Sequence, residues 1–374
     1  MMWLDAKEFL GITDVLRQRI EQTEDELRWV ENASADDLIK TAAAELHITV
    51  PSGMAPGLTA LQLGDKPHHD LLAAFQPHFP AGTALAGELA DQVQLCRAFA
   101  SPATVLDLVR TKVEDCANNF PRTAAQLKIG KNKGDVLDPF FLAANFELLS
   151  NRDLPTTLAN AIAHKVLMKI EDMLGNIHQL VLGHIRGNFR VPEPAGGRLG
   201  AKETLHPAIN PFPGADIGQV PIPSRSQRIR LFQVKNKTGS AKGGDGKRLG
   251  DQFRALENTY GADTFYAAVV GNTLVGHRSK GAVLRACPNT AVLVGQAALT
   301  ELTRAQTGAE MLLRTYQRAF RAVAAAGTYD HTKTVTDIVT TYEAEIEAAG
   351  TDFLETCLHE AMSGDPQAMD SRLK

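Results

Sequence analysis

The sequence has few cysteines, and they are not spaced as metal ligands or as a disulfide framework. The four of them, Cys96, Cys116, Cys287 and Cys357, stand far apart. No CxxC or Cys/His spacing of the kind that zinc sites use is present. We therefore interpret them as four ordinary buried thiols, and we exclude a zinc-finger or disulfide-rich class.

Long apolar runs are also missing. No run approaches the roughly 20 residues that a helix needs to cross a bilayer. The first residues, MMWLDAKEFL, are acidic and have a helical pattern, unlike a signal peptide. We expect a cytoplasmic globular protein without membrane association.

The sequence also lacks an excess of positive charge. The formal net charge is −4 and the isoelectric point is near 6.3, which argues against indiscriminate coating of nucleic acid, since such binding comes from an excess of Lys and Arg. Any nucleic-acid surface must therefore be local. Residues 225 to 254 offer one, with nine Lys or Arg residues and two acidic residues. The alternative is a solvated charged face.

The order of predicted elements indicates an α/β core between helical regions. The 374 residues contain 44% hydrophobic and 22% charged residues, as folded proteins typically do. Helical spacing dominates up to about residue 119, and a long helix is predicted from 154 to about 185. Strands are predicted at 229 to 235, 264 to 271 and 290 to 295, and helices at 246 to 261 and after 295. We divide the chain into a helical region (1–125), a core (126–305) and a second helical region (306–374).

The segment from 187 to 224 holds thirteen Gly and Pro residues. It is too long for a simple connection, so we suspect that it carries function or wraps a ligand. It contains Asp216, in the sequence FPGADIGQV. In the following strand, IRLFQVK, side chains alternate between faces, so that Gln233 and Lys235 point the same way. If the two segments pair as a hairpin, the carboxylate, the amide and the ammonium group converge.

Such a group of side chains suits phosphodiester hydrolysis. The catalyst must neutralise charge on the phosphate, activate water and stabilise the leaving oxygen, and Mg²⁺ does this well. Mg²⁺ prefers one or two carboxylates with other oxygens, which Asp216, Gln233 and the backbone carbonyl of Val234 offer. Lys235 would orient the attacking water and offset developing negative charge.

These residues resemble the bipartite signature of the PD-(D/E)XK nuclease superfamily, in the variant with Gln in place of the second acid. FPGADI supplies the first part and the strand FQVK the second, followed by a helix, the strand TFYAAVVG and VLVGQAALTELT. The order is similar to that of type II restriction endonucleases, and the resemblance covers about residues 155 to 305. It implies a central mixed sheet flanked by helices, Mg²⁺-dependent cleavage of double-stranded DNA, and a homodimer that acts on palindromic sites.

Two positions depart from the signature. Ala215 stands where the family often has Pro, and the neutral Gln233 weakens the binding of a divalent cation. In this family the helix before the catalytic strands often lends a Glu. Glu171 is the first candidate, since it shares one helix face with Gly175 and His178, and Glu203 is the second. The alternative for both is a solvated carboxylate.

The loop from 235 to 248 is not a nucleotide-binding P-loop. Gly246 and Lys247 are followed by Arg248 rather than Ser or Thr, and Ala241 takes the place of the upstream glycine. Glycines with interspersed lysines instead suit contacts with DNA phosphates, unless the loop is merely disordered. The predicted phosphate contacts are Lys237, Lys242, Lys247, Arg248, Arg225 and Arg228. Asn188, Arg190, Arg198, Arg225 and Arg228 are available to read bases in the major groove.

The histidines offer no second chemistry. His178, His184 and His206 lack HxH or HxxxH partners, and no GxSxG motif is present. We therefore expect packed or surface histidines.

The sequence favours a type II restriction endonuclease, with helical regions for dimerisation and DNA clamping and a DNA methyltransferase as its genetic partner. Two alternatives stay open. One is a DNA repair or recombination nuclease of the same superfamily, without sequence preference. The other is a catalytically inactive DNA-binding module that lost its metal through Gln233.

Overall fold

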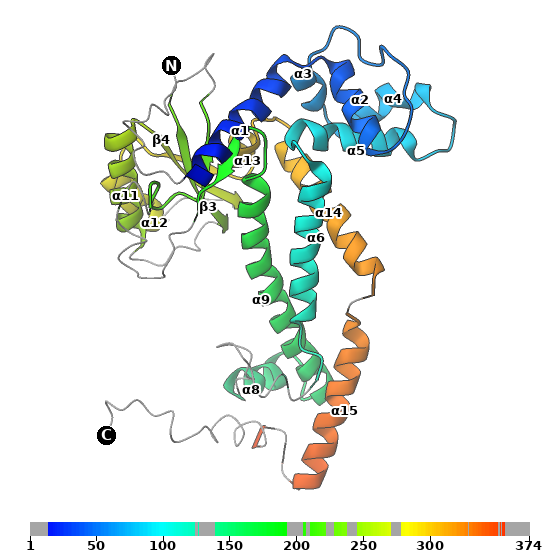
Figure 1. Cartoon of the computed structure of the whole chain (residues 1–374). Coiled ribbons are helices and arrows are strands. Elements are labelled where there is room, and N and C mark those ends of the chain that lie inside the picture. The colour runs from blue at the N-terminus through cyan, green and yellow to red at the C-terminus, as the bar shows by residue number, and fades with distance from the viewer. Residues whose placement is uncertain are drawn as a thin grey trace. The chain divides into compact units, whose positions relative to one another are not determined.

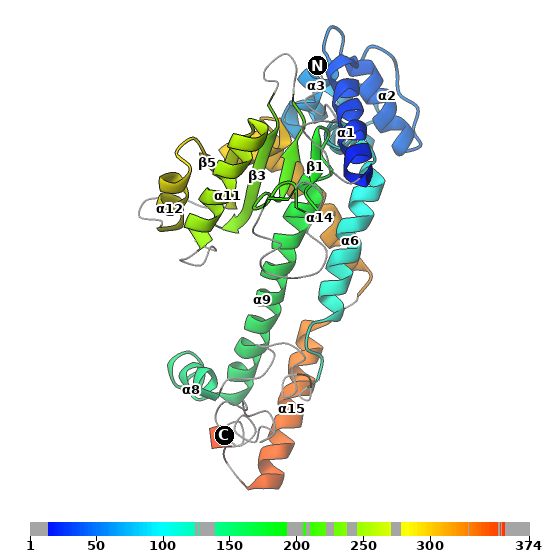
Figure 2. The same cartoon turned by 60° about the vertical axis from the view of Figure 1, so that its left-hand side comes forward.

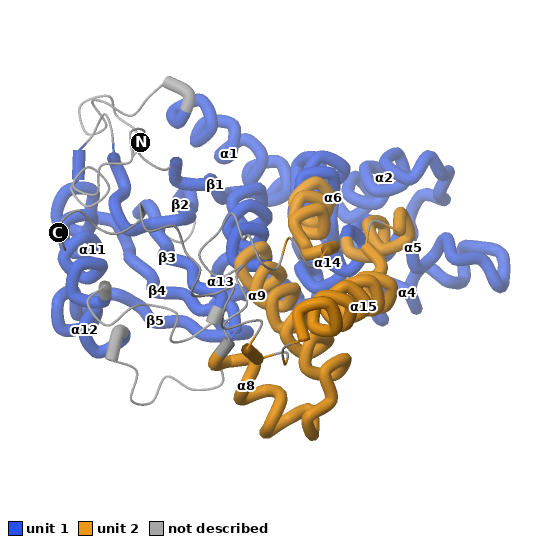
Figure 3. Tube along the Cα trace, turned by 90° about the horizontal axis from the view of Figure 1, so that it is seen from below, with its two compact units in different colours: residues 1–109, 174–319 blue, residues 110–173, 320–374 orange. Residues whose placement is uncertain are grey.

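The chain folds into an α/β structure, seen in a computed structural model (Figure 1). The residues that the structure describes are 14–123, 126, 139–192, 205–206, 210–221, 228–237, 245–270, 278–327, 329–350, 352 and 354–355. They form two compact units, residues 1–109 with 174–319 and residues 110–173 with 320–374 (Figure 3). Each unit thus combines two segments that are distant in the sequence. The functional division into 1–125, 126–305 and 306–374 stays a prediction.

Unit 1 contains a mixed sheet whose five strands lie in the order of the sequence. The strands are β1 (Asn188–Arg190), β2 (Ile217–Gln219), β3 (Arg230–Lys237), β4 (Asp263–Val270) and β5 (Ala291–Val294). The first three pair antiparallel, and the last three pair parallel. This confirms the α/β class, the mixed sheet and the three strands predicted beyond residue 228, while the assignment to the PD-(D/E)XK type stays a prediction.

Two helices make the parallel crossovers. α11 (Asp245–Tyr260) joins β3 to β4, and α12 (Arg278–Ala286) joins β4 to β5. Both lie on one side of the sheet, and α13 (Gln296–Thr303) lies on the other (Figures 1 and 3). Successive crossovers that advance in the same direction place their helices on the same face, because parallel connections are right-handed. The sequence pattern predicted α11 and α13 but missed α12 and the three-residue strand β1.

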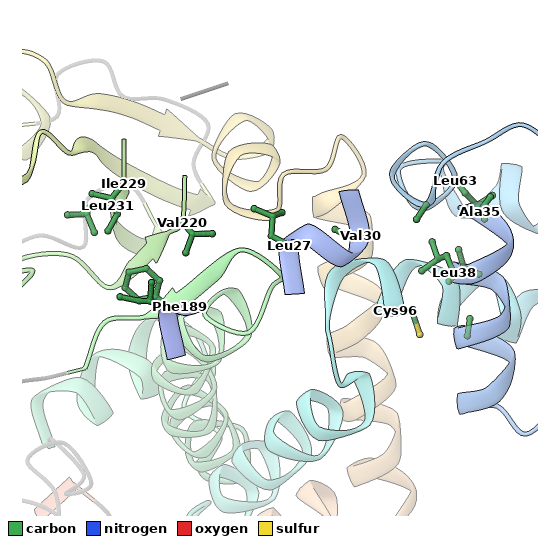
Figure 4. Close-up of a cluster of buried hydrophobic side chains, with 14 of the residues drawn as sticks. Leu27, Val30, Ala35, Leu38, Leu63, Cys96, Phe189, Val220, Ile229 and Leu231 are labelled. Carbon is green, nitrogen blue, oxygen red and sulfur yellow. The ribbon is translucent and has the colours of Figure 1, made fainter. Parts of the chain in front are cut away.

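The amino-terminal helices share a core with the sheet. They are α1 (Asp14–Asn32), α2 (Ala35–Glu45), α3 (Ala60–Gly64), α4 (His68–Phe75), the short 3₁₀ helix η1 (Gln76–His78) and α5 (Leu85–Ala98). Ser34 and Thr59 begin α2 and α3 with capping boxes, in which side chains satisfy the free N–H groups of the first turn. The core continues from Leu38 of α2 to Phe189 of β1 and Leu231 of β3 (Figure 4).

Three helices have residues in both units, namely α6 (Pro102–Asn118), α9 (Leu154–Leu182) and α14 (Gly308–Ala325). Unit 2 also contains α8 (Pro139–Leu148) and α15 (His331–Ala349), which Figure 2 shows from a second direction. Its core is small and is built from Leu142, Leu158, Ala161, Ile162, Ile338, Val339 and Tyr342. The expected helical character of both flanking regions is thus confirmed where the structure describes them.

The carboxyl end of α13 is anchored by side chains from other elements. The carbonyl groups of its last turn and of the next residues have no partner within the helix. They accept hydrogen bonds from Asn188 (2.8 Å), Gln219 (2.9 Å) and Arg97 (2.9 Å), all of which are buried. Asn188 therefore serves the fold, and the prediction that it is available to read DNA bases is wrong.

No helix among the described residues has the length and apolar character that a membrane crossing requires. The expectation of buried thiols is confirmed for Cys96 and Cys287, whereas Cys116 is only half-buried. Cys357 lies outside the described residues.

Candidate active site

Asp216 directly precedes β2, and its backbone is held by hydrogen bonds to the two neighbouring chain segments. Its N–H donates to the carbonyl of Phe232 (2.7 Å), and its carbonyl accepts from Val191 (2.9 Å). The preceding turn contains Gly214 with φ +80°, where a Cβ would come 2.7 Å from Oε1 of Gln252. A side chain at that position would meet both steric crowding and backbone strain. The turn therefore places Asp216 beside β3.

The carboxylate of Asp216 contacts two consecutive residues of β3. Its Oδ2 atom accepts a hydrogen bond from the N–H of Val234 (2.7 Å) and one from the Nε2 atom of Gln233. β2 and β3 pair antiparallel, with Ile217 opposite Phe232. The predicted hairpin pairing is thus confirmed, and it brings Asp216 and Gln233 together.

The charge of Asp216 is only partly compensated. Burial raises the pKa of its carboxyl group from 3.8 to about 6, although hydrogen bonds from Val234 and Gln233 and the charges of Lys235 and Arg190 oppose that rise. Desolvation disfavours the charged form, and here it outweighs all four opposing effects. A further cation close to Asp216 would favour the ionised form of this carboxyl group.

A recess of about 180 Å³ opens beside this carboxylate. Its polar lining comes from Gln179 on α9, Arg190 on β1, Asn210, Asp216 and Gln233. Sequence reasoning missed Gln179 and Asn210, and it considered Arg190 only as a base-reading residue. The one available signal for Gln179 was its place next to His178, on the helix that was already suspected of lending a residue to the site.

The geometry partly fits a divalent cation. Oδ1 of Asp216 and Oε1 of Gln233 have no hydrogen-bond donor among the described residues, so both are available as ligands. The carbonyl of Val234 points to the same side of β3 as its N–H, which faces Asp216. Mg²⁺ can be bound by a single carboxylate together with neutral oxygens when substrate phosphates supply its remaining ligands.

Among the described residues, no second carboxylate acts on Asp216. Within the described part of the chain, no group of three or more His, Cys, Asp or Glu side chains is arranged to hold a metal. Glu171 is an exposed residue of α9 in unit 2, and its contribution to the site stays a prediction. Glu203 lies outside the described residues.

The histidines near the sheet are engaged in structural contacts. His178 is buried, and its Nδ1 atom lies 2.9 Å from the hydroxyl of Tyr316. Burial lowers the pKa of His178, an effect that a hydrogen bond with Asn236 partly offsets. The Nδ1 atom of His184 lies 2.8 Å from the carbonyl of Leu180. The prediction of a packed histidine is thus confirmed for His178.

Several of the predicted phosphate contacts can be placed on the fold. Lys247 and Arg248 are exposed in the first turn of α11, and Arg228 is exposed just before β3. Two of these side chains have acidic partners, Lys247 with Asp251 (3.0 Å) and Arg228 with Asp263 (3.3 Å). The backbone of Lys237 ends β3. Lys242, Arg198 and Arg225 lie outside the described residues.

Neither of two comparisons with known proteins identifies a relative. The sequence matches no protein-family model, and a search of curated proteins found no match.

Proposed function

We propose that this protein is a magnesium-dependent endonuclease that hydrolyses phosphodiester bonds of double-stranded DNA, with Asp216, Gln233 and Lys235 at its centre. The observation that carries the proposal is the carboxylate of Asp216, whose charge is offset only in part and whose Oδ1 atom accepts no hydrogen bond from the described residues. It lies in a recess that also contains the amide of Gln233. The cationic groups of Lys235 and Arg190 act on the same carboxylate. A site with these charges suits an anionic substrate together with a divalent cation.

Each side chain then has a definite task. Asp216 and Gln233, with the carbonyl of Val234, would hold Mg²⁺, which supplies charge neutralisation at the phosphate and activation of water. Lys235 orients the attacking water and stabilises negative charge that develops on the phosphate oxygens. The exposed cations before β3 and at the start of α11 position the duplex through its phosphates.

The resemblance to type II restriction endonucleases makes site-specific cleavage the preferred form of this activity. It also carries the proposals of a homodimer, a cytoplasmic location and a genetically linked DNA methyltransferase. A catalytically inactive DNA-binding module is the second candidate, because no other described carboxylate acts on Asp216. In that case the recess would bind DNA without cutting it.

The first test is cleavage of long unmethylated duplex DNA in Mg²⁺, with EDTA and Lys235→Ala as controls. Loss of one preorganised charge of this kind typically costs about 100-fold or more in rate, and Lys235→Arg, which keeps the charge, should retain part of the activity. The melting temperature of both variants verifies that they are folded.

The products of this assay separate the candidates. Discrete fragments that disappear in both controls indicate a site-specific nuclease, whereas a smear indicates a nuclease without sequence preference. Intact DNA with retarded migration across many sequences and divalent ions would contradict the nuclease proposal and favour the binding module.

A further inference from the structure

Among the described residues, the side chain of Arg190 has no partner for its charge apart from an electrostatic interaction with Asp216. It lines the recess, remains exposed to solvent, and forms no salt bridge or hydrogen bond with any residue that the structure describes. A guanidinium group carries five N–H donors in a planar fork that matches the oxygens of a phosphate group. This binding capacity is therefore available to a ligand in the recess.

The end of α9 fixes the position of Arg190. A Cβ added to Gly183 would come 2.9 Å from the Cβ atom of Arg190, so the helix packs directly against β1 at this residue. Gln179 lies one turn earlier on the same face of α9 and lines the same recess. The side-chain amide of Gln179 also has no hydrogen bond among the described residues. Two donor groups without a hydrogen-bond partner among the described residues thus line the recess together with Asp216.

We propose that Arg190 and Gln179 form a phosphate-binding subsite next to Asp216. Arg190 donates to the non-bridging oxygens of a phosphate group, and the amide of Gln179 supplies a further donor. The assignment of that phosphate to the DNA backbone rests on the proposed nuclease function, whereas free phosphate would use the same chemistry. Arg190 therefore belongs to the substrate site rather than to base recognition.

The negative charge of Asp216 sets the strength of this subsite. The carboxylate repels an anion in the same recess, so binding without a divalent cation should be tighter in Asp216→Asn.

The test measures binding rather than cleavage, in EDTA and with two probes. Fluorescence anisotropy follows a short labelled duplex, and calorimetry follows inorganic phosphate. Arg190→Ala should weaken binding of a probe that uses the subsite by about 10- to 100-fold, the range for a lost hydrogen bond to a charged group. Arg190→Lys should retain part of the affinity, and Gln179→Ala should show a smaller loss. Arg285→Ala is the matched control, since it removes one exposed arginine from α12 in the same unit.

The two probes separate the outcomes. If Arg190→Ala binds both probes more weakly, the result supports a phosphate subsite that nucleic acid uses. If it binds only inorganic phosphate more weakly, the result supports the subsite with free phosphate as its ligand. Unchanged affinity for both probes in folded Arg190→Ala and Gln179→Ala would overturn the proposal. If no DNA is cleaved but Arg190→Ala still loses phosphate binding, the nuclease proposal fails and the subsite stands.

Discussion

At the scale of single residues, Asp216 combines a buried position with a charge that its neighbours offset only in part. Burial raises its pKa to about 6, so the folded protein holds this proton more tightly than the unfolded chain does. The protonated carboxyl group costs little, whereas the ionised one destabilises the fold. Below about pH 4 the carboxyl group is protonated in both the folded and the unfolded chain, so this destabilisation disappears. It reaches its full size above pH 6.

Replacing this residue by its neutral isostere should therefore stabilise the protein at alkaline pH. A rise of the pKa from 3.8 to about 6 corresponds to about 3 kcal/mol. We therefore expect Asp216→Asn to recover about 1 to 3 kcal/mol at pH 8 and almost nothing at pH 4. The measurement is thermal unfolding of both proteins across this pH range, without divalent metal.

Asp37 gives a control of opposite sign. Hydrogen bonds from Ser34 lower the pKa of this exposed residue, so Asp37→Asn should lose stability above pH 4 instead of gaining it. An unchanged or lower melting temperature of Asp216→Asn at pH 8 would show that the carboxylate is well compensated, and the case for a cation in the recess would weaken.

At the scale of elements, the position of Asp216 depends on close packing between β1 and β2. Gly218 of β2 pairs with Phe189 of β1, whose ring is fully buried. A Cβ at Gly218 would come 2.1 Å from the Cζ atom of that ring. Glycine at this position therefore allows the aromatic ring to cover β2, and the ring joins the sheet to the core.

Gly218→Ala should consequently destabilise the fold. Overpacking of a filled core typically costs about 1 to 3 kcal/mol, and we expect a loss at the upper end because the obstacle is a buried ring. Denaturant unfolding measures the effect. Gly87→Ala is the matched control, since nothing lies within 4 Å of a Cβ at this helical position, and it should stabilise the protein by about 0.5 to 1 kcal/mol. Phe189→Leu combined with Gly218→Ala should restore part of the loss, and a neutral effect of Gly218→Ala alone would contradict this packing.

The elements also show how much the sequence could predict. β3 and β4 have apolar runs long enough to be recognised, and the polar residues Gln233 and Lys235 alternate within β3. β1 has only three residues, so its strand character comes from pairing with β2 rather than from local pattern. α12, RSKGAVLRA, has only nine residues, of which one is a glycine and three are basic, so it offers too short an apolar pattern for recognition.

Only the residues of the candidate site that lie on or next to paired strands could be predicted from the sequence. Asp216 and Gln233 belong to one hairpin, so strand alternation was enough to bring them together. Gln179 reaches the recess through the packing of α9 against β1, a contact that no local spacing encodes. Asn188 was wrongly counted among the residues available to read bases, because its amide donates to the carbonyl of Leu302 in α13, more than a hundred residues later.

At the scale of the whole molecule, the charge is distributed unevenly. The net charge of −4 opposes binding to DNA, while residues 225 to 254 concentrate nine basic residues. Part of that local charge is already engaged, since Lys247 pairs with Asp251. Binding through such a segment releases counterions from DNA phosphates, and the affinity should therefore fall steeply with salt.

The dependence of DNA affinity on salt concentration gives the number of these phosphate contacts. Each neutralised phosphate contributes about −0.9 to the slope of log K against log salt concentration. Contacts by the six predicted residues Lys237, Lys242, Lys247, Arg248, Arg225 and Arg228 would thus give a slope of about −5. The double variant Lys247→Ala/Arg248→Ala should make the slope shallower by about 2, whereas Lys247→Arg/Arg248→Lys, which preserves the charge, should leave it unchanged. Anisotropy titrations of a duplex in EDTA at several salt concentrations provide the slopes. A slope near zero for the native protein, or equal slopes for both double variants, would place the DNA-binding surface elsewhere on the molecule.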